Sequence, residues 1–193
     1  RDEINTCIAC NQACLDHTFK NQRATCLVNP QACYETELRY LPTKKIKNIA
    51  EVGAGVAGLS AATVAARRGH RVTLFEAQNQ IGGQFNLAKV IPGKEEFYET
   101  LRYFEVQLKK YDVELKLSTQ VTHKYLEQAQ FDEVIIATGV VPRSLKLQGA
   151  DLPKVLSYSE VLNGAHVGQR VAVIGAGGIG FDVAEFLLKS AHQ

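Results

Sequence analysis

Two glycine-rich segments, far apart in the chain, constrain the fold more than any other feature of the sequence. Each has the pattern G-x-G-x-x-G, follows a short apolar run and precedes a stretch with helical spacing. The glycines are Gly53, Gly55 and Gly58 in the first segment and Gly175, Gly177 and Gly180 in the second. In a strand-loop-helix setting the three glycines permit a tight turn, close approach of a pyrophosphate, and close packing of helix on strand. The N-terminus of the following helix attracts the phosphates.

The residues around the first segment predict a β-turn-α-β unit. The run KIKNIAEV leads into the glycines, the alanine-rich stretch VAGLSAATVAARRGH ends at Gly69, and RVTLFEA is a second strand rich in β-branched residues. Glu76 ends that second strand, where a carboxylate accepts hydrogen bonds from an adenosine ribose. A purely structural interpretation stays open, in which the glycines only form a tight turn and Glu76 is a solvent-exposed residue at the end of a strand.

Further elements are expected between and after the two glycine segments. A helix beginning after Pro92-Gly93 carries an apolar stripe, VELKLSTQVT alternates like a strand, FDEVIIATG is typical of a buried strand, and RVAVI predicts a strand before the second loop. The stripe consists of Phe97, Leu101, Phe104 and Leu108. The predicted fold class is therefore α/β, with a Rossmann-like domain followed by the start of a second one.

The sequence divides into three predicted parts. Residues 1–43 form a cysteine-rich segment, 44–145 a partial FAD-binding domain, and 146–193 the start of an NAD(P)H-binding domain. Two dinucleotide loops in one chain, with Thr138 and Gly139 between them, suggest one site for FAD and one for a nicotinamide cofactor. The pair Gly82-Gly83 is expected to bring its backbone close to the flavin nucleotide. One strand and one helix do not cover both faces of a sheet, so the last part needs a partner or packs on the first domain.

Four of the five cysteines lie within twenty residues and have the spacing C-x2-C-x3-C-x11-C. They are Cys7, Cys10, Cys14 and Cys26. Three thiols in one short loop with a fourth from further along favour a 4Fe–4S cluster, and soft thiolates select iron–sulfur or zinc. Zinc stays open, with His17 as a possible ligand, and so do unliganded thiols. Cys33 is a spare thiol or a replacement for Cys26.

Net charge and hydropathy indicate which classes of binding partner are expected. The net charge is +2, which gives no indication of nucleic acid binding. No apolar run reaches the roughly 18 residues that cross a bilayer, so no membrane partner is expected. Cysteines clustered in one segment, rather than spread in an even-numbered framework, favour a reducing, cytoplasmic location.

Several motifs together resemble the bacterial NADPH-dependent 2,4-dienoyl-CoA reductases, within the iron–sulfur flavoenzyme family that includes trimethylamine dehydrogenase. The resemblance covers essentially the whole chain. It rests on INTCIACNQACLDHTF, CLVNPQACYETE, VGAGVAGLSAA, IGGQFNLAKVIPGKEEFYETLRYF, VLSYSEVL and IGAGGIGFDVA.

The resemblance implies a larger enzyme, of which this chain is an interior portion. Such enzymes carry an N-terminal TIM barrel that holds FMN, the acyl-CoA and the catalytic acid, and electrons pass from NADPH through FAD and 4Fe–4S to FMN. The implied ligands of the cluster are the four clustered cysteines, and Gly175, Gly177 and Gly180 lie under the NADPH pyrophosphate. The implied FAD contacts are Ala54, Gly55, Glu76, Gln84, Lys94 and the backbone around Val121. No catalytic residue is assigned, and this chain alone is expected to be inactive on acyl-CoA.

Other functions stay open. The chain is alternatively an inactive FAD-binding fragment, part of another NADH:flavin oxidoreductase of the same family, or a zinc-stabilised interaction domain. Two residues depart from the family pattern, Val56 in place of proline and Glu51 in place of an apolar strand residue. A buried Glu51 has to be paired or protonated, and its charge is expected to weaken FAD binding.

Overall fold

The computed structural model describes residues 1–143 and 146–190, which fall into two compact units. The first comprises Arg1–Gly83 and Glu96–Gly139, and the second comprises Gln84–Glu95 and Val140–Gln193. The predicted boundary at 145 lies outside the described residues, and the three-part division stays a prediction.

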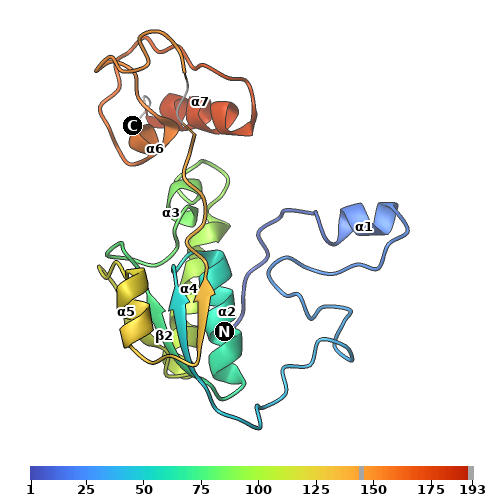
Figure 1. The fold of residues 1–193 in the computed structure, drawn as a ribbon. Coiled ribbons are helices and arrows are strands. Elements are labelled where there is room, and N and C mark those ends of the chain that lie inside the picture. Colours follow the sequence, from blue (N-terminus) through green and yellow to red (C-terminus); the bar gives the residue numbers. More distant parts are fainter. Residues whose placement is uncertain (144–145, 191–193) are drawn as a thin grey trace. The chain divides into compact units, whose positions relative to one another are not determined.

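The first unit is built around a parallel sheet of four strands within the described ranges (Figure 1). In chain order these are β1 (Asn48–Val52), β2 (Arg71–Phe75), β3 (Glu114–Lys116) and β4 (Glu133–Ile136). Their spatial order is β3-β2-β1-β4, so β1 is central and carries the first glycine loop at its carboxyl end. This order confirms the predicted α/β fold class, because parallel neighbours require helical crossovers.

One helix packs directly on the sheet, and a second helix packs on the first. Helix α2 (Val56–Arg67) packs against β1, β2 and α4 (Glu96–Lys110). Helix α2 ends where Gly69 adopts a φ of +96°, as its sequence predicted. In α4 the predicted apolar stripe is buried at Leu101, Phe104 and Leu108, while Phe97 is half-buried. The period of the apolar residues therefore identified the face of this helix correctly.

Aromatic contacts cover the other face of the sheet. The ring of Phe75 makes edge-to-face contacts with Tyr125 of α5 (His123–Gln128), at 5.7 Å, and with Phe131, at 6.0 Å between ring centroids. Successive strand residues point to opposite faces, so Leu74, the neighbour of Phe75, faces the layer that holds α2. Both faces of β2 are thus buried, and this strand forms part of the core.

Two predicted strands differ from the structure. Residues 131–139 were expected to form a buried strand, but all four residues of β4 are exposed because β4 is an edge strand here. Of the predicted strand 113–122, only Glu114–Lys116 pairs in the sheet. The residues that follow turn back, where Ser118 and Thr119 donate backbone hydrogen bonds to the segment after β2.

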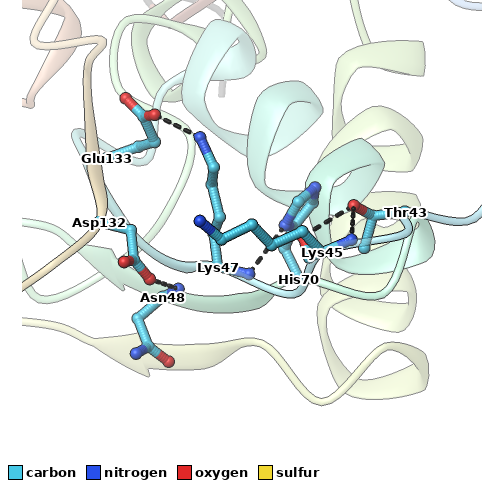
Figure 2. A network of polar contacts seen from close by, with 7 residues as sticks. All are labelled: Thr43, Lys45, Lys47, Asn48, His70, Asp132 and Glu133. Atoms are coloured by element: carbon cyan, nitrogen blue, oxygen red, sulfur yellow. Dashed lines mark hydrogen bonds and ion pairs between the residues drawn. The ribbon is translucent and has the colours of Figure 1, made fainter.

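A polar network fixes the beginning of β1, at the end of the strand opposite the glycine loop (Figure 2). The backbone N–H of Asn48 donates to Asp132 at 2.7 Å, and that of Lys47 donates to the imidazole of His70 at 3.3 Å. The ammonium group of Lys47 also pairs with Glu133 at 2.5 Å. These contacts tie the start of β1 to the residue before β2 and to the start of β4, and so help to set the register of the sheet.

The N-terminal residues of the first unit are held against α4. Arg102 donates to the carbonyl oxygens of Asp2, at 2.6 Å, and Ile4, at 3.0 Å, and Lys110 pairs with Glu3. This attachment brings the start of the cysteine segment to the surface of the sheet domain. The segment itself contains one short helix, α1 (Leu15–Phe19), whose residues are not buried.

Replacing Arg102 with alanine is expected to release these N-terminal residues, because two hydrogen bonds to backbone carbonyls disappear together. Limited proteolysis should then cleave near residues 1–6 several times faster, while the melting temperature changes by less than about 3 °C, the size expected for a surface change. Glu105→Ala, an exposed change on the same helix, is the control. Equal cleavage rates in the two variants would show that Arg102 does not hold the segment.

The second unit has its own small core. It contains α3 (Phe85–Ala88), α6 (Tyr158–Leu162) and α7 (Gly178–Ser190), and Ser157 and Glu160 form a capping box at the start of α6. Its buried residues are Ile91, Val161, Leu162 and Val183. The Lys94 ammonium pairs with Asp182 of α7 at 2.6 Å, which ties the segment 84–95 to this unit.

The predicted strand at 170–174 is not formed, which corrects the sequence interpretation. Residues 171–176 have no strand assignment, and the side chains of Val171, Val173 and Ile174 are 41–72% exposed. A strand forms by pairing with a neighbour, and the described part of the second unit offers none. Helix α7 forms as expected, because its hydrogen bonds are local.

Candidate dinucleotide-binding site

The first glycine loop is a tight turn between β1 and α2. Gly53 has a φ of +106°, and a Cβ at this position would lie 2.4 Å from the Ala137 carbonyl oxygen. A Cβ at Gly58 would lie 1.8 Å from the Gly53 carbonyl oxygen, so the helix start touches the backbone of the turn. At Gly55, by contrast, a Cβ would meet no atom within 4 Å. The loop is therefore closely packed on its protein side and open at its middle glycine.

The predicted glycine pair after Glu76 lies against this loop. Gly82 donates its backbone N–H to the Ala54 carbonyl oxygen at 2.8 Å. Gly83 has a φ of +52°, and a Cβ on it would lie 3.2 Å from the Gly55 Cα. Two stretches of bare backbone thus meet at Gly55, which is the open position. This geometry supports the expectation that Gly83 brings backbone close to a bound nucleotide.

The carboxylate of Glu76 lies next to the loop. One of its oxygens accepts the Ala54 N–H at 2.7 Å and the other accepts the Gln78 N–H at 2.8 Å. The residue is 9% exposed, so these bonds fix its side chain at the carboxyl end of β2. A carboxylate held at this point by backbone donors retains lone pairs for ribose hydroxyls.

Other predicted contact residues gather at the same edge of the sheet. Val121 belongs to the loop after β3, in which the Thr119 N–H donates to the Glu76 carbonyl oxygen at 2.8 Å. Thr138 follows β4, and its Cα would lie 3.1 Å from a Cβ on Gly53. Gly139 comes next, with a φ of +73°. The carboxyl ends of β1, β2, β3 and β4 therefore bring the first-unit candidates together, where parallel sheets bind ligands.

Glu51 lies inside the core below this loop. It is fully buried near the carboxyl end of β1, and neither carboxylate oxygen has a hydrogen-bond partner. Its Oε1 lies 3.2 Å from the position of a Cβ on Gly58, so it faces the first turn of α2. Desolvation by burial raises the pKa of Glu51 to about 7. The sequence departure at this position thus places an unpaired acid beneath the loop.

The second glycine loop repeats the turn and the helix start of the first, but a Cβ on Gly175, unlike one on Gly53, would meet no atom within 4 Å. Gly175 has a φ of +114°, a Cβ on Gly180 would lie 2.0 Å from the Gly175 carbonyl oxygen, and one on Gly177 would meet nothing within 4 Å. Gln84 and Lys94, two predicted FAD contacts, belong to this second unit. There the Gln84 side chain donates to the Val140 carbonyl oxygen at 3.0 Å, and Lys94 pairs with Asp182. Their FAD contacts stay predictions.

The described cysteine segment does not bring three thiols together at one point. Among the described residues, no three His, Cys, Asp or Glu side chains are placed to hold a metal ion. The Thr25 N–H donates to the Ala13 carbonyl oxygen at 2.7 Å, which places the backbone at Cys26 beside that at Cys14. The Cys7 sulfur accepts the Ala9 N–H at 3.4 Å.

The two other residues considered as ligands have local contacts. His17 donates from Nδ1 to the Arg23 carbonyl oxygen at 3.1 Å. Cys33 is exposed, with its own N–H bound to Glu35 at 3.0 Å.

None of the helices in the described part of the chain combines enough length and apolarity to cross a bilayer.

A parallel sheet with a glycine loop at the end of its central strand and an acid at the end of the next defines a dinucleotide-binding domain. The pyridine nucleotide-disulphide oxidoreductase family matches residues 47–193, and the chain belongs to this family. Its fold is Rossmann-like, as in this family.

Similar proteins include several reductases. The chain is 37% identical to a metal reductase of Desulforamulus reducens, over 98% of this chain and 29% of the relative. It is 36% identical to a cinnamate reductase of Clostridium sporogenes, over 100% of this chain and 29% of the relative. The structure of a 2-naphthoyl-CoA reductase has a TM-score of 0.89 at 33% identity, with 98% of this chain and 29% of that one covered. The chain thus spans less than a third of the length of these relatives.

Proposed function

We propose that this chain is the dinucleotide-binding portion of an NAD(P)H-dependent flavin reductase, with FAD at the first glycine loop and the nicotinamide dinucleotide at the second. The observation that carries the proposal is the repeated loop geometry. In both loops the third glycine touches the carbonyl oxygen of the first, and the middle glycine is open. Two such loops in one chain provide two pyrophosphate sites, which a reductase with a flavin and a nicotinamide cofactor requires.

The residues of the first unit have distinct roles in this proposal. The α2 N-terminus and the open backbone at Gly55 hold the FAD diphosphate, and Glu76 binds the adenosine ribose. Gly83, Thr138, Gly139 and the backbone at Val121 surround the nucleotide at the carboxyl edge of the sheet. The bound flavin supplies hydride and single-electron chemistry. No side chain of this chain is assigned a proton-transfer step.

We extend the proposal to a 4Fe–4S cluster on Cys7, Cys10, Cys14 and Cys26. The donor set fits, because four thiols on one segment have the softness that iron–sulfur clusters require. The side chains as placed do not converge, so binding has to draw the thiols together. None of the four is in a disulfide, Cys7 and Cys14 are exposed, and Cys10 and Cys26 are partly exposed, which leaves them room to move. A cluster held there supplies one-electron transfer.

More specifically, we propose that the whole enzyme is of the 2,4-dienoyl-CoA reductase type. It would use NADPH and act in the cytoplasm. It rests on the motif resemblance, and the similarity to a 2-naphthoyl-CoA reductase supports a thioester substrate class. Much of the length of the relatives lies outside the aligned region, which leaves room for an FMN-containing barrel as the partner domain. Activity on an acyl-CoA is expected only with that barrel present.

Exchanging single cysteines tests the cluster. Cys14→Ser should lower bound iron after anaerobic reconstitution at least several-fold, because one of four ligands is lost, and should reduce absorbance near 400 nm. Cys33→Ser is the matched control and should retain iron, since Cys33 lies outside the proposed ligand set. Metal analysis by mass spectrometry gives the result. Zinc in place of iron in the wild-type chain, or equal iron loss in both variants, would overturn the cluster assignment.

A second candidate function is that of an FAD-binding portion without nicotinamide turnover. The exposure of Val171, Val173 and Ile174 favours it, because the second loop is not backed by a sheet in the described residues. The two candidates separate in one assay, in which NADPH reduces an artificial electron acceptor in the presence of the FAD-loaded chain. Turnover supports the complete reductase portion, and FAD binding without turnover supports this second candidate.

A further inference from the structure

An unpaired acid lies beneath the loop to which we assign the FAD diphosphate. Glu51 is the penultimate residue of β1, in register with Leu74 of β2 and Ile135 of β4, so its strand neighbours are apolar. The residue is 0% exposed and both of its oxygens lack a hydrogen-bond partner. Its Oε1 lies 3.2 Å from the Cβ position of Gly58, in the first turn of the 12-residue helix α2. The carboxyl group is therefore aimed at the same helix terminus that faces the diphosphate.

The charged groups on the surrounding elements do not compensate this acid. On β2, Arg71 lies at the opposite, exposed end of the strand, and Glu76, just after the strand, has both oxygens bound to backbone N–H groups. Next to β1 and β4, at the far end of the strands, Lys47 is paired with Glu133. On α2 the nearest cation is Arg67, nine residues beyond Gly58 and so about 14 Å along the helix axis.

Helix α4, which packs on α2, has its own charged residues. They are Glu96, Glu99, Arg102, Glu105, Lys109 and Lys110, and none belongs to the buried set of that helix. Desolvation is the only cause that raises the pKa of Glu51, with no contribution from a neighbouring charge. The protonation state of Glu51 thus depends on burial, and on whatever charge arrives at the loop above it.

An incoming diphosphate adds negative charge to the helix terminus that an ionised Glu51 already faces. Two like charges in a poorly hydrated site repel strongly, and the helix terminus cannot neutralise both. A protonated Glu51 removes this conflict. We propose that Glu51 is a proton-linked affinity determinant of the first dinucleotide site, which binds FAD when Glu51 is neutral and rejects it when Glu51 is ionised. This inference rests on the proposed function, because it takes the first loop to be an FAD site.

The expected change of the apparent Kd for FAD with pH follows from the fraction of the protein that is competent to bind. If only the neutral form binds, the apparent Kd equals the intrinsic Kd divided by the neutral fraction. With a pKa of about 7 for Glu51, that fraction is about nine-tenths at pH 6 and about three-hundredths at pH 8.5. The apparent Kd for FAD should therefore rise about thirtyfold between pH 6 and pH 8.5.

The experiment measures FAD binding to the full chain by flavin fluorescence at pH 6, 7 and 8.5. Glu51→Gln keeps the shape of the side chain and cannot ionise, so its Kd should change less than threefold over this range. Glu51→Leu is a second variant that also cannot ionise, and it serves if the buried amide disturbs folding. Circular dichroism at each pH establishes that each protein is folded.

The outcomes separate this inference from the function on which it rests. A steep rise of Kd in the wild type and a flat profile in either variant supports the inference. The same pH profile in the wild type and both variants overturns it and leaves the FAD site standing. Failure of all three folded proteins to bind FAD at any pH overturns the assignment of the first loop to FAD, and the inference with it.

Discussion

Replacing Gly58 with alanine is expected to abolish FAD binding and to lower the free energy of unfolding by about 3 kcal/mol, the range of severe overpacking. The new methyl group would lie 1.8 Å from the Gly53 carbonyl oxygen, which is backbone and cannot rotate away. Gly53 itself is fixed, because its N–H donates to the Phe75 carbonyl oxygen at 2.8 Å. The start of α2 therefore has to move away from β1. Urea denaturation and FAD titration of the variant measure the two effects.

The matched control is Gly55→Ala in the same loop. Gly55 has a φ of −72° and a ψ of 177°, which alanine adopts readily, and a Cβ there meets no atom within 4 Å. This variant should keep its stability within about 1 kcal/mol of the wild type, as for an unstrained site. Its methyl group would occupy the approach to the loop and should weaken FAD binding at least tenfold. Unchanged FAD affinity in Gly55→Ala would show that the diphosphate does not lie over this residue.

The sequence predicted the first unit well because its determinants are local. The turn at Gly53, the end of α2 at Gly69 and the buried stripe of α4 each follow from residues within a few positions of one another. Glu76 could be placed beside the loop because parallel strands end at a common edge. Its bond to the Ala54 N–H was not predictable, since it depends on a side-chain rotamer set by the fold.

The sequence was less informative where structure depends on distant neighbours. The run EVII in β4 has the composition of a buried strand, but its burial depends on what lies beyond the edge of the sheet. The run RVAVI has strand composition too, and residues 171–176 remain unpaired for the same reason. The spacing of the cysteines predicts ligand chemistry, but not the side-chain positions, since nothing local draws four thiols together.

The stability of the wild-type chain is expected to fall as the pH rises from about 4.5 to about 7, because of Glu51. Its pKa rises from 4.5 to about 7 on folding, so the folded state binds a proton that the unfolded state has released between these values. The stabilisation by the neutral Glu51 is fully present below pH 4.5, decreases as the pH rises towards about 7, and is lost above it. It amounts to about 3 kcal/mol, at about 1.4 kcal/mol per unit of pKa.

The other carboxyl groups with a shifted pKa affect stability in a different pH range. Hydrogen bonds lower the pKa of several surface acids, so their small contributions are lost only in acid. They are Glu3, Glu95, Glu114 and Glu160.

The free energy of unfolding of Glu51→Gln should therefore lie within about 1 kcal/mol of the wild-type value at pH 5 and exceed it by about 3 kcal/mol at pH 8.5. The exposed variant Glu105→Gln should follow the wild type at both values. If the difference between Glu51→Gln and the wild type stays constant from pH 5 to pH 8.5, then Glu51 does not titrate in this range. That result would contradict the raised pKa, which follows from a fully buried carboxyl group without a hydrogen-bond partner.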